Sequence, residues 1–145
     1  MNGALTIGTY DGANIEILDA VGAENFVLFG LRAEEVEVQK ENYDPLTVVA
    51  DDRDLAAVVD ALKSGLFNLD EAGIFDSIIN AMLSPHDPWM TIADFRAYIH
   101  AQAEVADLWR DQSGWIQKSI RNVAASGFFS TDRTMQEYNK DIWKL

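Results

Sequence analysis

A turn near the start of the sequence, residues 8–14, holds residue types suited to binding a small anion or a sugar. It contains two glycines, Gly8 and Gly12, together with the polar side chains of Asp11 and Asn14. Ligands of open parallel sheets bind beyond the carboxyl ends of strands, where helix N-termini also favour anions. The turn could therefore face a phosphate or a sugar. The alternative is a tight connection in which Asp11 caps a helix and Gly12 takes an unusual backbone angle.

Other residues that could carry chemistry do not form recognisable sets. The glycine spacing matches neither the dinucleotide fingerprint nor the P-loop. His86 lies in a proline-flanked loop and His100 in a predicted helix, and neither has a second histidine at ligand spacing. The sequence has no cysteine, which excludes disulfides and thiolate metal sites. Pattern alone therefore predicts no metal site and no catalytic set.

The turn is predicted to lie between a strand and a helix. Residues 4–9 are small or apolar and β-prone, which indicates a short buried strand. A helix is expected from about residue 13 to residue 21, ended by Gly22, and residues 25–30 form a second buried-strand candidate. Strand, helix and strand in thirty residues fit a βαβ unit with parallel pairing. The fold class predicted from these elements is α/β.

The rest of the chain, residues 31–145, is predicted to be mainly helical. Helices are expected over residues 33–40, 51 or 52 to 64, 74–82, 94–110, 113–127, and from 130 or 131 to the end. Leu46–Val49 is the one weak strand candidate in this part. The apolar residues Trp115, Ile116, Ile120 and Val123 are expected to face inward. Two strands do not make a stable α/β sheet, so the chain is expected to be part of a larger domain.

The charge balance limits the classes of partner. The 24 acidic residues outnumber the 11 basic ones, and the net charge is −13. Because phosphate backbones are bound by clustered lysines and arginines, nucleic acid is not an expected partner. No apolar run approaches the roughly 20 residues of a membrane span, so no membrane partner is expected either. We predict a cytoplasmic protein, and the acidity serves either solubility or an acidic binding face.

Four blocks of the sequence resemble the α-glucan phosphorylases, the family of glycogen, starch and maltodextrin phosphorylases. The blocks are residues 2–16, 22–30, 93–98 and 125–134, followed by Tyr138, Ile142 and Trp143. They occur in the family's order and reach the end of the chain. The first block departs mainly at Tyr10, where the family usually has leucine, and residues 31–90 match more loosely.

The resemblance implies a glycosyltransferase B-type fold, in which two Rossmann-like domains flank a cleft. Pyridoxal phosphate is bound covalently in the C-terminal domain of such enzymes. The family transfers the terminal glucose of an α-1,4-glucan to inorganic phosphate and releases glucose 1-phosphate with retained configuration, while the cofactor phosphate shuttles a proton. Residues 1–145 would form the C-terminal part of the cofactor-binding domain, with a βαβ portion over 1–30 and a mainly helical portion over 31–145.

The resemblance also implies that the cofactor lysine is not in this chain. The family signature runs Glu-Ala-Ser-Gly-x-Gly-x-Met-Lys-x-x-Leu/Met-Asn, and Met1-Asn2 matches only its last two positions. The lysine would lie three residues upstream of Met1, and no lysine precedes Lys40. We therefore expect no catalytic residue, no bound pyridoxal phosphate and no activity. Three residues remain candidates for the edge of the cleft: Asn2, Asp11 and Asn14.

The partners expected from the resemblance are the missing N-terminal part of the parent enzyme and, for that parent, α-glucan and phosphate. The chain by itself is expected to self-associate, because its terminal helix carries the apolar residues Met135, Tyr138, Ile142 and Trp143. The alternative interpretation is a stand-alone acidic module that reuses the fold for binding or regulation.

Overall fold

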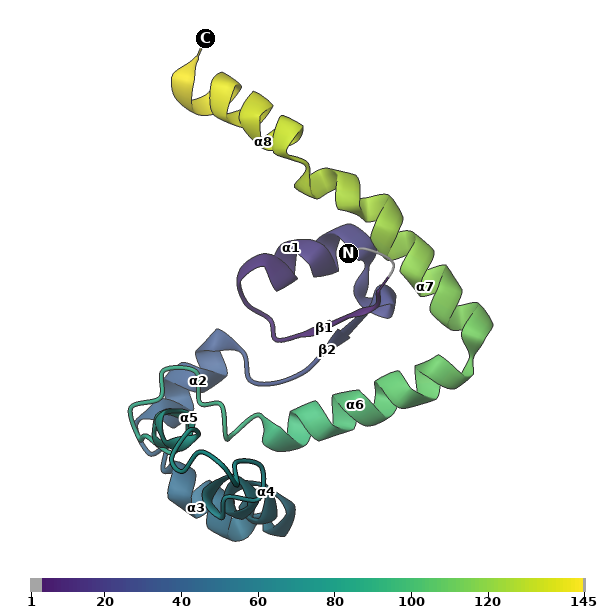
Figure 1. The fold of residues 1–145 in the computed structure, drawn as a ribbon. Coiled ribbons are helices and arrows are strands. Elements are labelled where there is room, and N and C mark those ends of the chain that lie inside the picture. The colour runs from purple at the N-terminus through teal and green to yellow at the C-terminus, as the bar shows by residue number, and fades with distance from the viewer. Residues whose placement is uncertain (1–3, 145) are drawn as a thin grey trace. The chain divides into compact units, whose positions relative to one another are not determined.

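The computed structural model describes residues 4–144, and Figure 1 traces its elements. The chain divides into two compact units. One unit combines the described residues up to Phe29 with those from His100 onward, and the other spans Gly30–Ile99. The long helix α6 (Phe95–Arg110) contributes to both units.

The first unit contains the strand–helix–strand arrangement that the sequence predicts. Strand β1 (Thr6–Gly8) pairs in parallel with β2 (Phe26–Leu28), with Ile7 beside Val27. Helix α1 (Gly12–Val21) and the short 3₁₀ helix η1 (Ala23–Asn25) connect the strands. The α/β class is therefore confirmed. Between residues 4 and 144 the sheet has these two strands and the secondary structure is otherwise helical.

Helix α7 (Gln112–Ala125) packs against α1 and η1. Asp111 caps it by accepting a hydrogen bond of 3.0 Å from the backbone N–H of Gly114. The predicted start at residue 113 is one residue late, because the helix has already begun at Gln112. The 3₁₀ helix η2 (Ser126–Phe129) follows, so α7 also ends before Gly127.

The orientation of α7 differs from the sequence-based prediction. Ile116, Ile120 and Val123 were expected to face inward, but they are 53%, 61% and 48% exposed. The fully buried residue of this helix is the polar Asn122. The prediction is wrong for these three residues because hydrogen bonds of Asn122, not the apolar stripe, orient the helix against the sheet.

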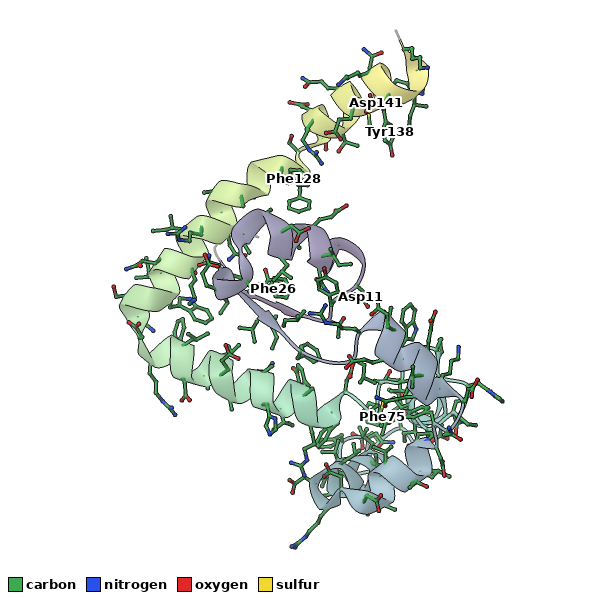
Figure 2. All side chains as sticks on the ribbon, turned by 180° about the vertical axis from the view of Figure 1, so that it is seen from behind. Asp11, Phe26, Phe75, Phe128, Tyr138 and Asp141 are labelled. Carbon is green, nitrogen blue, oxygen red and sulfur yellow. The ribbon has the colours of Figure 1, made fainter. Side chains whose placement is uncertain are left out.

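The first unit ends with helix α8 (Thr131–Glu137), which continues as the π-helix η3 (Tyr138–Trp143). The Ser130 hydroxyl caps α8 by accepting a hydrogen bond from the N–H of Arg133, and the helix begins at Thr131, one of the two predicted starts. The principal contacts of α8 are with its neighbours η2 and η3. Figure 2 shows Tyr138 on this terminal helix, with no other element beside it.

The second unit is built from helices. They are α2 (Ala33–Lys40), α3 (Pro45–Asp51), α4 (Arg53–Lys63), α5 (Asp76–Met82) and the first turn of α6. Its core centres on Leu55, Val59 and Ile92, against which pack the partly buried residues Val48, Val49, Met82, Leu83 and Phe95. Helix α2 has the predicted bounds, residues 33–40, and contains no buried residue.

The weak strand candidate Leu46–Val49 is wrong, since these residues lie in α3. The Asp44 carboxylate accepts hydrogen bonds from the N–H of Leu46 at 3.0 Å and from the Thr47 hydroxyl at 2.8 Å. Pro45 occupies the first helical position, where its fixed φ angle favours a helix start. The cap signal therefore outweighs the β preference of the two valines. No helix of residues 4–144 has the length and apolar character needed to cross a membrane.

Candidate functional site

The candidate site predicted from the sequence lies at the carboxyl end of β1. The Asp11 N–H donates to the Thr9 carbonyl at 3.0 Å, which makes a tight turn before α1. Gly12 has a φ of +46°, so the unusual backbone angle expected there is confirmed. A side chain on Gly8 would come within 2.7 Å of Nδ2 of Asn14. The turn therefore brings the Asn14 amide against the end of the strand.

Asp11 takes the N-cap position of α1 with an extended backbone, but its side chain makes no capping hydrogen bond. The sequence-based expectation of a side-chain cap is therefore wrong. The carboxylate is exposed beside the helix N-terminus, and Figure 2 labels it at the end of the turn. An exposed carboxylate there opposes the binding of a second anion through like-charge repulsion. Asn14 is partly buried, and Asn2 lies outside the described residues.

Sequence reasoning missed a buried polar cluster that joins α7 to β1 and to η1. The Asn122 amide is fully buried and donates from Nδ2 to the Asn25 carbonyl at 3.0 Å and to the Lys118 carbonyl at 3.1 Å. Its Oδ1 accepts a hydrogen bond of 3.2 Å from the Thr6 hydroxyl. Asn25 is also buried and donates to the Val21 carbonyl at 2.7 Å. These bonds fix α7 to β1 and to the residue before β2.

Burial raises the pKa of two acidic groups in the second unit, Asp94 and Tyr43. Burial raises the pKa of Asp94, although the N–H of Leu31 donates to its carboxylate at 2.8 Å and lowers the pKa in part. Burial, with Asp87 as the next largest influence, raises the pKa of Tyr43. Shifted pKa values often mark functional sites, but structural networks shift them too. The hydrogen bond to Leu31 gives Asp94 a structural role in holding the chain before α2.

Asp87 is another buried carboxylate with a structural role. Only 8% of it is exposed, and it accepts hydrogen bonds from the N–H groups of Trp89 at 3.0 Å and Thr91 at 2.9 Å. These bonds close the loop that also contains His86 and Pro88. Among residues 4–144, no group of three or more histidine or acidic side chains is arranged to hold a metal ion.

The residues around the β1–α1 turn do not fit pyridoxal phosphate. A cofactor held as an imine needs a lysine, and its phosphate needs cationic or N–H donors. The first basic residue in the sequence is Arg32, which belongs to the second unit. In the first unit, the Lys118 amine donates to the backbone carbonyl of Glu24. We therefore assign no step of a cofactor reaction to these residues.

The chain matches the carbohydrate phosphorylase family over residues 1–145. It is 47% identical to the glycogen phosphorylase of Synechocystis sp. (strain ATCC 27184 / PCC 6803 / Kazusa), over all of this chain and 17% of that protein. It is 45% identical to the brain form of human glycogen phosphorylase over 99% of this chain and 17% of that protein. Identity to the Chlamydia pneumoniae glycogen phosphorylase is 41%, over all of this chain and 18% of the relative.

The match covers nearly all of this chain but only a small part of each relative. The chain spans about a sixth of the length of these relatives, while they cover it almost from end to end. The resemblance that the sequence indicates in four separate blocks therefore extends through residues 31–90 as well. The chain belongs to the carbohydrate phosphorylase family.

Proposed function

We propose that this chain is the C-terminal portion of an α-1,4-glucan phosphorylase and has no catalytic activity by itself. The observation that supports the proposal is the family match over residues 1–145, within relatives about six times as long. The parent would convert glycogen, starch or maltodextrin and inorganic phosphate to glucose 1-phosphate, using pyridoxal phosphate. In this proposal the parent acts in the cytoplasm.

The proposed inactivity of the chain rests on the residues that it contains. The proposed parent holds its cofactor through a lysine upstream of Met1, and the sequence has no lysine before Lys40. The β1–α1 turn carries no basic residue to bind either phosphate. The remainder of the parent would supply these groups, and it is therefore the necessary partner.

In the parent, we place β1 and α1 in a Rossmann-like domain of the glycosyltransferase B-type fold. The parallel pairing of β1 with β2 supports this placement, because parallel strands joined by a helix are the unit of that domain. Asn2, Asp11 and Asn14 would then lie at the edge of the cleft. Their role would be to shape that edge, since the contacts described above place neither Asp11 nor Asn14 against a base or a nucleophile.

A chimera tests the proposal. In the full-length Synechocystis glycogen phosphorylase, the matching segment is replaced by this 145-residue chain, and glucose 1-phosphate formation from glycogen and phosphate is measured. The 47% identity between the segments leads us to expect activity within roughly tenfold of the unmodified enzyme. The purified 145-residue chain with added pyridoxal phosphate is assayed beside it, and we expect no product and no cofactor absorbance.

Two outcomes would count against the proposal. A chimera that folds and takes up pyridoxal phosphate but forms no glucose 1-phosphate would favour the alternative, a stand-alone binding or regulatory module. Product formed by the purified 145-residue chain would contradict the predicted inactivity.

A further inference from the structure

Trp89 lies on a loop of the second unit with most of its side chain in solvent. It is 73% exposed, the largest exposed fraction of any aromatic side chain between residues 4 and 144. Burying an indole ring removes a large apolar area from water, so a fold that leaves it exposed forgoes a large stabilisation. Because loops on a fixed scaffold often carry binding residues, this ring is a candidate contact for a ligand.

The neighbours of Trp89 anchor the loop in the second unit. The buried Asp87 carboxylate accepts hydrogen bonds from the backbone N–H groups of Trp89 at 3.0 Å and Thr91 at 2.9 Å. The side chains of Met90 and Ile92 are buried, with exposed fractions of 1% and 2%. The Trp89 ring therefore projects from an anchored backbone, which lowers the conformational entropy that a ligand would have to remove on binding.

The backbone next to Trp89 is strained. Met90 has a φ of +48°, in the left-handed region that residues with a Cβ atom rarely adopt. At this turn the chain buries Met90 and leaves the larger apolar side chain of Trp89 exposed. Strained backbone conformations are frequent at ligand-binding sites. The conformation of Met90 is therefore a second, independent indication that the loop presents Trp89 to a ligand.

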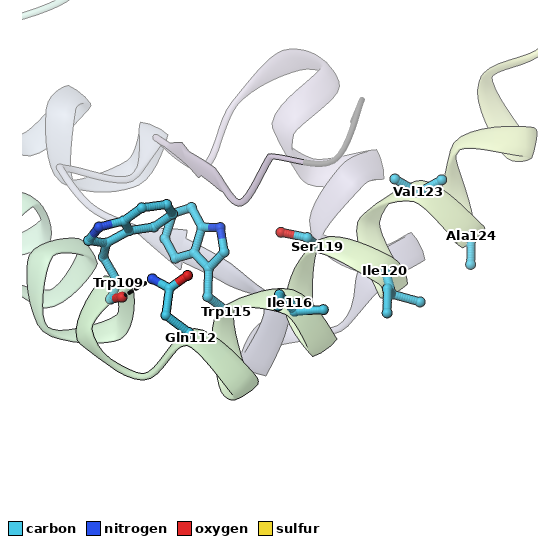
Figure 3. Close-up of a pocket in the computed structure, with 8 residues that line it drawn as sticks. All are labelled: Trp109, Gln112, Trp115, Ile116, Ser119, Ile120, Val123 and Ala124. Carbon is cyan, nitrogen blue, oxygen red and sulfur yellow. Dashed lines mark hydrogen bonds between the residues drawn. The ribbon is translucent and has the colours of Figure 1, made fainter.

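The other three tryptophans each pack against another aromatic ring. Trp109 and Trp115 meet edge to face with their centroids 5.0 Å apart (Figure 3), and Trp143 meets Tyr138 with 5.9 Å between the centroids. Among residues 4–144, no aromatic ring packs against that of Trp89. The electron-rich face of this indole is therefore open to a partner with weakly positive C–H groups, such as a pyranose ring.

The charges and polar groups of the loop favour a neutral ligand that carries hydroxyl groups. Residues 84–93 contain no lysine or arginine, and the net charge of the chain is −13, so an anionic ligand would be repelled. His86 and Thr91 are exposed on the same loop, and an imidazole and a hydroxyl can both exchange hydrogen bonds with sugar hydroxyls. A sugar therefore fits these residues better than a phosphorylated ligand does.

We propose that Trp89 and its exposed neighbours form a surface subsite for an α-1,4-glucan, in which a glucose ring stacks on the indole. The choice of an α-1,4-glucan rests on the proposed function, which makes such a chain the substrate of the parent. The subsite uses only residues of this chain and needs no cofactor. The purified 145-residue chain should therefore bind glucan without converting it.

Native gel electrophoresis of the purified chain over a series of glycogen concentrations tests the subsite. We expect glycogen to retard the wild-type chain, and maltoheptaose to shift the NMR signal of the Trp89 indole N–H with a dissociation constant of about 1 mM. Trp89→Leu should bind glycogen at least about tenfold more weakly, because leucine has no ring face, whereas Trp89→Tyr should stay within about threefold of the wild type. Phe67→Ala is the matched control, since Phe67 is 64% exposed in the same unit, and it should bind like the wild type.

Two results would overturn the proposed subsite. A wild-type chain whose mobility does not change with glycogen would leave Trp89 for contact with another protein surface, such as the rest of a longer chain. Equal retardation of wild type and Trp89→Leu, with equal helix content by circular dichroism, would place the glucan elsewhere on the chain. The chimera reports separately on the proposed function, because an active chimera beside a chain that binds no glucan rejects the subsite alone.

Discussion

At the residue scale, the polar side chain of Asn122 joins separate parts of the first unit. Its amide is fully buried and bonds to Thr6, to the Asn25 carbonyl and to a carbonyl of its own helix. Leaving a buried polar group without its hydrogen-bond partner destabilises the folded state by more free energy than forming one hydrogen bond contributes. The contacts of α7 with the sheet therefore depend on the amide as well as on apolar packing.

Substitution of Asn122 by alanine should lower the free energy of unfolding by about 2–3 kcal/mol, because it leaves the Asn25 carbonyl and the Thr6 hydroxyl without their partner. Urea denaturation followed by circular dichroism measures the change. Gln117→Ala on the exposed side of the same helix is the control and should stay within about 0.5 kcal/mol of the wild type. Equal effects of the two substitutions would show that the buried bonds contribute little.

The ion pair at Asp52 makes the stability of the second unit depend on pH. The Arg96 guanidinium hydrogen-bonds both oxygens of Asp52 and also reaches Asp54 at 2.8 Å. This contact, with a smaller influence from the N–H of Leu55, holds the pKa of Asp52 below its ordinary value. At a pH near or between the folded and unfolded pKa values of Asp52, the unfolded chain binds more protons than the folded chain. The free energy of unfolding therefore rises with pH in that range.

The contribution of the Asp52 ion pair to stability is fully present above the unfolded pKa of about 3.9. It is lost as the pH falls through the lower pKa of the folded state. Arg96→Gln should therefore reduce the loss of stability between about pH 5 and about pH 2, measured as the urea midpoint at each pH. Arg110→Gln is the control, because Arg110 pairs with Asp107 within one helix and both side chains are more than 70% exposed. An unchanged pH profile for Arg96→Gln would contradict this account.

At the element scale, the end of α1 depends on Gly22. Its backbone has φ 85° and ψ 149°, a region that side chains with a Cβ atom rarely enter, and its N–H donates to the Leu18 carbonyl at 2.8 Å. The glycine lets the chain leave the helix and reach β2 within a few residues. The sequence predicts this stop correctly, because glycine directly after an apolar helical repeat is a strong signal.

Gly22→Ala should lower the free energy of unfolding by about 1–3 kcal/mol, since it forces the backbone into a strained region and meets the Glu24 carboxylate at 2.8 Å. Gly127→Ala is a suitable control, because its φ is not positive and no atom lies within 4 Å of the added Cβ. Thermal unfolding of the two variants provides the comparison. A similar melting temperature for both would show that the backbone angle of Gly22 is not a constraint.

Sequence patterns predict the elements of this chain better than their orientation. Short apolar runs identify β1 and β2, and glycines and cap residues identify the end of α1, both ends of α4 and the start of α8. The pattern fails at Leu46–Val49, where a capping aspartate and Pro45 outweigh β preference. It also fails on α7, because helical periodicity does not distinguish a face that packs inward from one left exposed.

At the scale of the candidate site, the sequence locates the β1–α1 turn but not its contacts. Gly12 adopts the expected angle, whereas Asp11 does not cap α1 with its side chain. The buried Asn122 cluster was missed because its partners, Thr6 and Asn25, lie about 100 residues away in the sequence. A single asparagine within a helix gives no sequence signal of such distant hydrogen bonds.

At the scale of the whole molecule, the features of this chain agree with the proposal that it is part of a longer protein. The family match covers residues 1–145 but only about a sixth of each relative, and the described sheet has two strands. Apolar residues on α7 and on the terminal helix are exposed. In our proposal, the rest of a phosphorylase chain completes the domain and supplies the cofactor lysine.

Glucose 1-phosphate formation from glycogen and phosphate, with pyridoxal phosphate present, tests this central claim most directly. The account predicts product from the Synechocystis enzyme that carries this chain in place of its own matching segment, and none from the purified 145-residue chain. Product from the purified chain would contradict the claim, and so would a folded, cofactor-loaded chimera that forms none.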